Sequence, residues 1–431
     1  MINTVNIIKW SLKMGGNVTG ITKSGKETHA QKIPLKSIGR KVFVDKITAL
    51  LKFINKDFEK EFKNKLWKDE TQIANGFIFN GSTSFIMNQE YSDEEIVRYK
   101  PSCGDLDIAV PEFLKENLWR YLDKNDEKEI IPGVTYMGSN KPTIDSIGSQ
   151  INCVFLIEFE IDGHAEKCPC QIDWEFLPFT ETGIPTQWAK FSHSSSFEDC
   201  KAGVKAVHHK YLLRALVGGA SLRTDIVVAT GKSTWDNVTL TKSASHLNPR
   251  MLKFSVDKGL RVAYEPLLDP NGKSVFVDGK QVFKEIPTKN SNFVTDVWQI
   301  FLLTMKPSDI EDAKKSGDES KMWSYMGVLN LIKKYCDTKQ IEETYDRYVE
   351  LLWGLKPARA QELERNDSEG DYKVKIGGYL KFVETLGLKD ESKDLCPPYY
   401  ADYGQRGRMS ESVLESFSSY LAFKNYVQEY Y

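Results

Sequence analysis

The chain has 431 residues, of which 41% are hydrophobic and 12% aromatic, and its formal net charge is -2. This length exceeds what one ordinary hydrophobic core uses, so we expect two or three domains. The small net charge excludes a generic polyanion-binding protein, and no apolar run approaches the roughly 18 residues of a membrane-spanning helix.

The charge is unevenly distributed along the chain. Residues 1–40 carry seven Lys or Arg against the single acid Glu27, and residues 201–265 carry eleven Lys or Arg against four acids. These two stretches predict a face suited to phosphates, with an ordinary solvated surface as the alternative. The seven cysteines show no repeating framework and the N-terminus lacks a charged start followed by a long apolar core, so reduced thiols in a cytoplasm are expected.

The first part of the chain predicts a basic arm, a long helix and a strand. Residues 1–40 are rich in Gly, Thr and Lys and are interpreted as an arm or small hairpin. From Lys41 to Trp67 apolar residues recur at intervals of three and four, which predicts an amphipathic helix. The apolar run Phe77–Phe79 predicts a strand that ends in a Gly-Ser turn, and residues 111–123 predict a helix with Pro in its first turn.

The remainder predicts a hairpin, a basic helix, a β-rich segment and a helical end. Residues 154–160 and 169–176 are typical of strands, and Asp162-Gly163 between them is a hairpin signal. A helix is expected over residues 197–216, strands over 224–287, and mainly helices over 294–431. The predicted fold class is α/β (α+β), with an arm at 1–40, a mixed-sheet domain at 41–216, a β-rich basic segment at 217–290 and a helical domain at 291–431.

Three acids stand out in these predicted strands. Asp105 and Asp107 are separated by one residue, and side chains in a strand alternate between its faces, so both acids project from one face. Asp173 lies in the later strand and completes the group if that strand runs beside the first. Carboxylates in such a group can hold two divalent ions about 3.5 to 4 Å apart for phosphoryl or nucleotidyl transfer.

The turn at Gly81-Ser82 fits the same chemistry. A glycine lets the backbone approach phosphates closely and donate N–H groups, while the serine adds a hydroxyl. A lysine from a neighbouring helix would complete such a cradle.

Together these residues resemble the DNA polymerase β-like nucleotidyltransferases, which include CCA-adding enzymes, poly(A) polymerases and cGAS-like synthases. The family pattern is a strand ending in Gly-Ser, then Asp-x-Asp, then an Asp on a later strand, and it is met by Gly81-Ser82, Asp105-Leu106-Asp107 and Asp173. The resemblance covers roughly residues 45–215, and the interval from Gly81 to Asp105 is longer than in compact members. The whole chain also looks like nucleotidyltransferases of tailed bacteriophages.

The resemblance implies a role for each matching residue. Gly81, Ser82 and Ser84 would contact the triphosphate, and the three aspartates would bind Mg²⁺ or Mn²⁺. Lys205 or Lys210 would contact the terminal phosphates. The expected reaction moves a nucleoside monophosphate from a nucleoside triphosphate to a hydroxyl with release of pyrophosphate, and an RNA end or another nucleotide is the favoured acceptor.

Other interpretations of the acids stay open. They could be ordinary surface acids, or the metal ligands of a nucleotide-sugar glycosyltransferase, although the apolar strand then usually precedes the acids. An AbiE-type toxin nucleotidyltransferase is a nearer alternative, because Arg98 lies upstream of Asp105, but the usual Gly-Gly is missing. The fourth alternative is a catalytically silent protein that senses nucleotide or nucleic acid on the same scaffold.

Several further motifs do not predict sites. The segment 229–233 resembles the end of a P-loop, but Ile226 stands where the first glycine is required. His164, Cys168 and Cys170 lack a paired Cys-x-x-Cys and a fourth ligand for zinc. His208-His209 has no identifiable orienting partner for nucleophilic catalysis.

Overall fold

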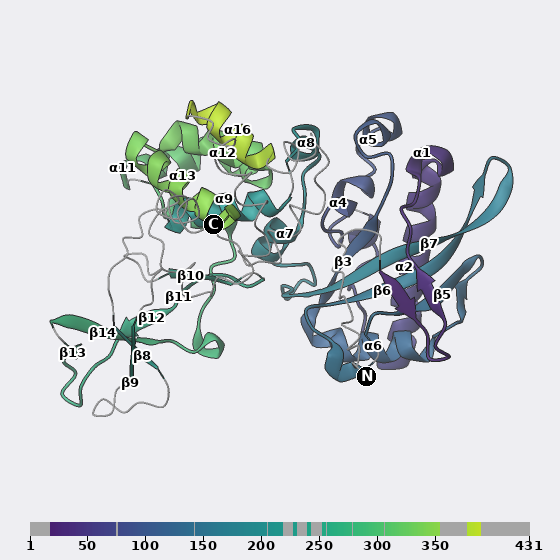
Figure 1. Cartoon of the computed structure of the whole chain (residues 1–431), viewed down its shortest axis with the longest axis horizontal. Coiled ribbons are helices and arrows are strands. Elements are labelled where there is room, and N and C mark those ends of the chain that lie inside the picture. Colours follow the sequence, from purple (N-terminus) through teal and green to yellow (C-terminus); the bar gives the residue numbers. More distant parts are fainter. Residues whose placement is uncertain are drawn as a thin grey trace, which may run out of the picture. The chain divides into compact units, whose positions relative to one another are not determined.

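The computed structural model describes residues 18–74, 76–141, 143–204, 206–218, 227–230, 239–242, 252–255, 257–277, 279–305, 307–353 and 377–388. The chain divides into two compact units, Met1–Pro185 (unit 1) and Thr186–Tyr431 (unit 2), and each is described by itself (Figure 1). This division precedes residue 216, where the sequence predicted the end of the mixed-sheet domain.

Unit 1 is built on a mixed seven-stranded sheet in the order β2-β1-β5-β6-β7-β3, with β4 paired to β5. Only β3 and β7 pair in parallel; the other pairs are antiparallel. The predicted α+β class is therefore confirmed. The strands are β1 (Thr19–Ile21), β2 (Glu27–His29), β3 (Asp105–Pro111), β4 (Glu129–Ile131), β5 (Val134–Ser139), β6 (Gln150–Ile161) and β7 (His164–Leu177).

The two longest strands form the predicted hairpin. Strands β6 and β7 are joined by Asp162 and Gly163, whose φ angles of 52° and 79° lie in the left-handed region. A two-residue turn with positive φ at both positions matches the right-handed twist of the flanking strands, which explains the Asp-Gly pair. The hairpin therefore fixes the register that carries Asp173 into the sheet.

One face of this sheet is covered by helices. The predicted amphipathic helix is α2, and it ends earlier than expected, at Phe62, where Lys63 takes a left-handed φ of 56°. Its apolar side is fully buried, and the Phe43 ring lies 6.1 Å from the ring of Phe159 on β6. The helices are α1 (Leu35–Ile38), α2 (Arg40–Phe62), α3 (Thr71–Ala74), α4 (Thr83–Ile86), α5 (Asp93–Tyr99) and α6 (Lys115–Lys124), with 3₁₀ turns at Glu112–Leu114 and Ile144–Ser146.

Two predictions for unit 1 are wrong in detail. Residues 77–80 do not form a strand; Gly76 takes a φ of 73°, a turn follows, and only Phe79 makes an isolated bridge, to Ile108 of β3. Pro111 ends β3 rather than starting a helix, and α6 begins four residues later.

Unit 2 combines a helical core with two small sheets. The core contains fully buried side chains such as Trp188, Phe301, Tyr325 and Tyr348. The helices are α7 (Gln187–His193), α8 (Phe197–Lys201), α9 (Ala206–Gly218), α10 (Val297–Leu302), α11 (Pro307–Lys315), α12 (Tyr325–Tyr335), α13 (Thr338–Trp353) and α16 (Gly377–Leu386), with 3₁₀ turns at Thr288–Asn290 and Asp318–Trp323.

The strands of unit 2 occupy the segment predicted to be β-rich. One sheet pairs β10 with β11, and the other has the order β12-β14-β8-β9, with β13 paired to β14. These strands are β8 (Val227–Thr230), β9 (Thr239–Lys242), β10 (Leu252–Ser255), β11 (Gly259–Val262), β12 (Tyr264–Pro266), β13 (Phe276–Val277) and β14 (Lys280–Glu285).

The single helix predicted over residues 197–216 is wrong, because it is divided in two. Helix α8 ends at Lys201, and Gly203 follows with a left-handed φ of 73°, a conformation that commonly terminates helices. Residues 1–17 of the basic arm and residues 354–376 and 389–431 of the segment expected to be mainly helical lie outside the described residues. Within the described parts of the chain, no helix has the length and apolar character needed to cross a bilayer, and none of the six described cysteines is in a disulfide.

Candidate metal centre on the mixed sheet

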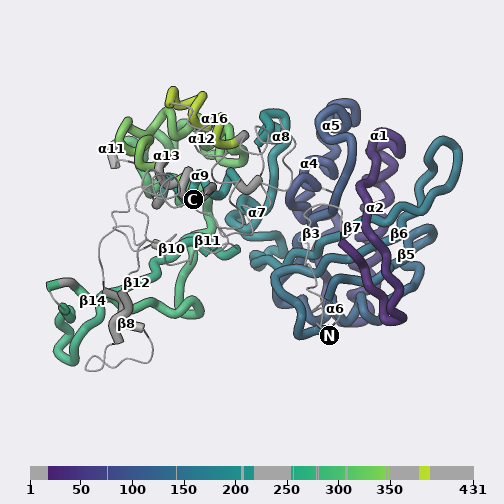
Figure 2. Tube along the Cα trace, viewed as in Figure 1, coloured from purple at the N-terminus to yellow at the C-terminus, as the bar shows by residue number. Residues whose placement is uncertain are grey.

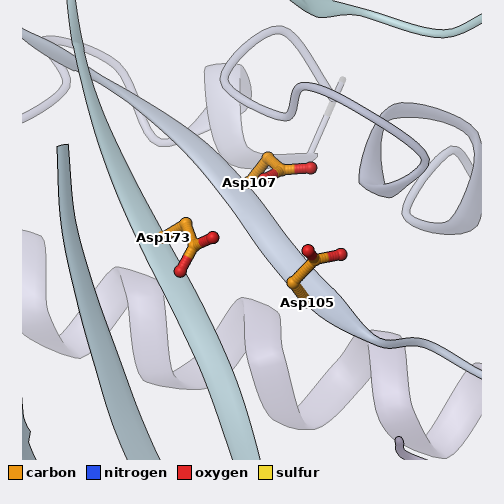
Figure 3. A group of neighbouring side chains, drawn as sticks. All are labelled: Asp105, Asp107 and Asp173. Atoms are coloured by element: carbon orange, nitrogen blue, oxygen red, sulfur yellow. The ribbon is translucent and has the colours of Figure 1, made fainter. Parts of the chain in front are cut away.

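The three predicted aspartates come together on one face of the unit 1 sheet. Strands β3 and β7 run in parallel, with Asp107 opposite Asp173 and Asp105 opposite Gln171. One carboxylate oxygen from each aspartate lies within 4.8 Å of the others. Figure 3 shows Asp105 and Asp107 on one strand, Asp173 on its neighbour, and all three carboxylates gathered above the sheet.

The alternation of side chains explains this grouping. In β3, Leu106 and Ile108 are fully buried, while Asp105 and Asp107 are half-buried on the opposite face. In β7, Trp174 points to the helix-covered face and stacks on Trp67 with ring centroids 6.4 Å apart. A strand whose apolar residues are buried on one face must present the alternate residues on the other.

The carboxylates destabilise one another in their ionised forms. Burial raises the pKa of Asp173 to about 7, and the charges of Asp105 and Glu175 also raise it. Burial raises the pKa of Asp107 well above its usual value, and the charges of Glu175, Asp105 and Asp173 add to this. Burial likewise raises the pKa of Asp105, although the charge of Lys100 lowers it. Within the described residues, none of the three aspartates forms an ion pair with a basic side chain, so the group could hold a metal ion.

Two amide side chains orient Asp173. Gln171 donates from Nε2 to both carboxylate oxygens of Asp173 at 2.9 Å, and its Oε1 accepts from the backbone N–H of Val18 at 3.3 Å. Asn152, opposite Asp173 in β6, also hydrogen-bonds the carboxylate and lowers its pKa. Asn140 donates in turn to Asn152 Oδ1 at 2.7 Å. The sequence analysis missed these residues. The register of β6 and β7 is needed to find Asn152, whereas the alternation of side chains along β7 could have indicated Gln171, two residues before Asp173.

The Gly-Ser turn lies against the acids. The backbone trace shows α4, which follows the turn, beside β3 (Figure 2). Thr83 Oγ1 accepts from the N–H of Asp107 at 3.0 Å and donates to the carbonyl of Asp105 at 3.3 Å. Gly81 has a φ of 50°, and a Cβ there would lie 2.0 Å from Asp107 Oδ2. Only glycine therefore lets the backbone come this close to the carboxylate.

The serines of the turn differ in their surroundings. Ser82 is half-buried and directly precedes α4. Ser84 donates its hydroxyl to the carbonyl of Gly81 at 2.8 Å. Because phosphate oxygens only accept hydrogen bonds, Ser84 would have to leave this bond to contact a triphosphate.

Neither of the predicted lysines belongs to unit 1, which carries the acids. Lys205 lies outside the described residues, and Lys210 is half-buried on α9 of unit 2, so its role stays a prediction. Lys100 belongs to unit 1 instead and is close enough for its charge to lower the pKa of Asp105 and Asp107. Its position five residues before Asp105 is the sequence signal that could have identified it.

The competing motifs have other roles. His208 Nδ1 lies 2.6 Å from the hydroxyl of Tyr348, and His209 Nε2 lies 3.0 Å from the carbonyl of Met322, so both are buried core residues. The Asp105, Asp107 and Asp173 cluster is the single group of His, Cys, Asp or Glu suited to a metal in the described parts of the chain.

A pocket of about 260 Å³ lies elsewhere in unit 1. Its wall includes Trp119 and Leu122 of α6, Tyr136 of β5 and Ile151 of β6. Ile151 neighbours Asn152, which faces Asp173, so this pocket opens on the other face of the sheet. It is separate from the aspartates.

Comparisons with protein-family models, with curated proteins and with solved structures found no match to this chain.

Proposed function

We propose that the chain is a nucleotidyltransferase that depends on Mg²⁺ or Mn²⁺ and moves a nucleoside monophosphate from a nucleoside triphosphate to a hydroxyl. The observation that carries the proposal is the convergence of Asp105, Asp107 and Asp173, whose ligand atoms lie within 4.8 Å of one another beside the Gly81-Ser82 turn. The resemblance to DNA polymerase β-like nucleotidyltransferases supports it, because the same three pieces define that family.

The donor set fits a hard divalent cation. Three carboxylates supply only oxygen ligands, which suit Mg²⁺ and Mn²⁺, whereas structural zinc sites draw mainly on Cys and His. The raised pKa values of the three acids show that their negative charge is poorly compensated by the chain itself. When bound, the cation would supply charge neutralisation for the triphosphate and lower the pKa of the attacking hydroxyl.

The chain's own residues would do the positioning. Asp105 and Asp107 hold their carboxylates together on one strand face, and the Gly81-Ser82 turn offers backbone N–H groups at the same place. Asp173, held by Gln171 and Asn152, faces the acceptor hydroxyl in this proposal. Catalysis would then come mainly from orientation and electrostatic stabilisation.

We favour an RNA end or another nucleotide as the acceptor. The support is the basic composition of residues 1–40 and 201–265, which suits polyphosphate ligands. A protein side chain or a small molecule as acceptor would give a labelled product of a different size. The size of the labelled product therefore identifies the class of acceptor.

The test is to incubate the purified protein with each labelled nucleoside triphosphate, Mg²⁺ or Mn²⁺, and a pool of small RNAs. We expect pyrophosphate release together with a labelled product, and a loss of both by at least about 10³-fold in Asp105→Ala and Asp107→Ala. The matched control is Asp45→Ala, which removes an exposed aspartate of α2 that pairs with Lys41. Metal-dependent nucleotide binding without any product would support the sensing alternative, and neither binding nor product would contradict the proposal.

A further inference from the structure

Asn80, the residue before Gly81, is tied to two strands at once. Its backbone N–H donates to the carbonyl of Asp107 on β3 at 2.9 Å. Its side chain is fully buried, and Nδ2 donates to Oε2 of Glu175 on β7 at 2.6 Å. The segment that leads into the Gly-Ser turn is thus fixed to both strands that carry the aspartates.

The side-chain bond crosses over β3. Phe79 pairs with Ile108 along one edge of β3, and β7 pairs along the other edge, with Glu175 opposite Ala109. Ala109 shares a face with Asp107 and has only a methyl group, so a hydrogen bond between Asn80 and Glu175 can pass above it. Any larger side chain at residue 109 would occupy that space.

The orientation of the Asn80 amide follows from its partner. The amide nitrogen must face the Glu175 carboxylate, since the amide oxygen would be repelled by it. This leaves Asn80 Oδ1 buried with no hydrogen-bond partner among the described residues. A buried oxygen without a hydrogen-bond partner lowers the stability of the fold. The favourable contribution of the Asn80 side chain is therefore its hydrogen bond to Glu175.

Glu175 differs from the three aspartates in its surroundings. It lies two residues beyond Asp173 on the same strand face, and its charge raises the pKa of Asp107. Among the described residues, the group of acids that lie close enough together to hold a metal ion nevertheless contains the three aspartates and not Glu175. An amide N–H at 2.6 Å already engages Oε2, as expected of a carboxylate that orients another group.

We propose that Asn80 and Glu175 are positioning residues, whose hydrogen bond holds the Gly81-Ser82 turn at the distance from the aspartates that a nucleoside triphosphate requires. This inference rests on the proposed function for its ligand. Whether the hydrogen bond holds the turn in place can be tested by hydrogen exchange, without a catalytic assay.

The experiment compares Asn80→Ala, Glu175→Ala, Glu175→Gln and the double alanine variant, with Glu160→Ala as the control. Glu160 is an exposed acid at the far end of the same hairpin. Hydrogen exchange is followed in peptides that cover residues 78–87, and Mn²⁺ affinity is measured by electron paramagnetic resonance. The Michaelis constant for each nucleoside triphosphate is determined with Mg²⁺.

We expect exchange in this segment to be at least about tenfold faster in Asn80→Ala and Glu175→Ala, with the double variant no faster than either single one. Glu175→Gln should rescue exchange to within about threefold, because its amide oxygen still accepts from Asn80. Mn²⁺ affinity should stay within about threefold of wild type in every variant, while the Michaelis constant for the nucleotide rises about tenfold in the two single alanine variants.

Two results would overturn the inference. Unchanged exchange in Asn80→Ala and Glu175→Ala would show that the bond does not hold the turn. A large loss of Mn²⁺ affinity in both Glu175→Ala and Glu175→Gln would make Glu175 a metal ligand instead. If the wild-type protein bound no nucleotide, the proposed function would fail, yet the exchange data would still decide whether the pair fixes the turn.

Discussion

Both units contain carboxylates that are largely shielded from solvent, but their pKa values are shifted in opposite directions. Asp318 in unit 2 accepts hydrogen bonds from Lys321 at 2.6 Å, from Lys334 at 2.7 Å and from the hydroxyl of Tyr335 at 2.8 Å. These bonds hold the pKa of Asp318 far below its usual value. The aspartates of unit 1 have raised pKa values, with burial as the first cause in each case.

This contrast distinguishes an acid that stabilises the fold from acids whose charge the chain leaves uncompensated. Asp318 is neutralised by side chains of its own unit, so its charge stabilises the fold. Asp105, Asp107 and Asp173 form no such ion pair within the described residues, and their mutual repulsion is a cost that an external cation would relieve.

The largest expected effect is the pH dependence of Mn²⁺ affinity. Asp173 has a pKa of about 7 in the folded chain, so below pH 7 the cation must displace a proton from it. Affinity should fall about tenfold per pH unit below pH 7 for this proton alone, and more steeply where Asp107 is also protonated. Titrations of Mn²⁺ at pH 8, 7 and 6 measure this, and an affinity that does not change over this range would contradict a raised pKa for Asp173 as a ligand of the cation.

Gly81→Ala should weaken both the fold and cation binding. The new Cβ would lie 2.0 Å from Asp107 Oδ2 at a backbone φ of 50°, so the turn or the carboxylate must move. We expect a loss of about 2 to 3 kcal/mol in the free energy of unfolding and roughly tenfold weaker Mn²⁺ binding. Gly163→Ala, also at positive φ but with no atom near its Cβ, is the control for backbone strain, and it should leave Mn²⁺ binding unchanged.

Asp318→Asn should destabilise unit 2. The substitution leaves two lysines and a tyrosine without the carboxylate that they share, at a cost of about 1 to 3 kcal/mol. The pKa of Asp318 is lowered on folding, so its contribution to stability is present in full above the usual pKa and is lost as the pH falls from there through the lowered pKa. The difference between variant and wild type should therefore be smaller at pH 3 than at pH 7. Urea unfolding at pH 7 and pH 3 measures this, with the exposed Asp312→Asn as the control.

Asp107→Asn should raise the free energy of unfolding when no divalent cation is present, whereas Asp318→Asn lowers it. The pKa of Asp107 is raised on folding, so its ionisation lowers stability as the pH rises above the usual value. At pH 8 the neutral amide should therefore raise the free energy of unfolding by about 1 kcal/mol, whereas at pH 4 it should change little. A destabilised variant at pH 8 in a chelating buffer would contradict the contrast with Asp318.

The sequence was sufficient for features that depend on local patterns. The 3.6-residue periodicity of α2, the Asp-Gly turn between β6 and β7 and the alternation around Asp105 and Asp107 each follow from neighbouring residues. The unbroken helix expected over residues 197–216 was wrong because Gly203 at positive φ interrupts it, and the residues expected to form a strand before Gly81 instead form a turn that begins at Gly76, also at positive φ. An apolar run does not reveal such a conformation in advance.

The supporting residues of the site needed the three-dimensional register. Asn152 becomes a partner of Asp173 only once β6 and β7 are aligned, whereas Gln171 shares a strand face with Asp173; Glu175 meets Asn80 across 95 positions of sequence. No spacing rule links Asn80 to Glu175. The roles of Lys205 and Lys210 are implied by the family resemblance, and their relation to the aspartates remains a prediction.

The most direct test of the cation site is a Mn²⁺ titration of the full chain at pH 8, followed by electron paramagnetic resonance, for wild type, Asp105→Asn, Asp107→Asn and the control Asp45→Asn. We predict saturable binding in wild type and in Asp45→Asn, and at least about 30-fold weaker binding in Asp105→Asn and Asp107→Asn. Equal affinity in all four proteins, or no binding in wild type, would contradict the assignment of these aspartates as metal ligands.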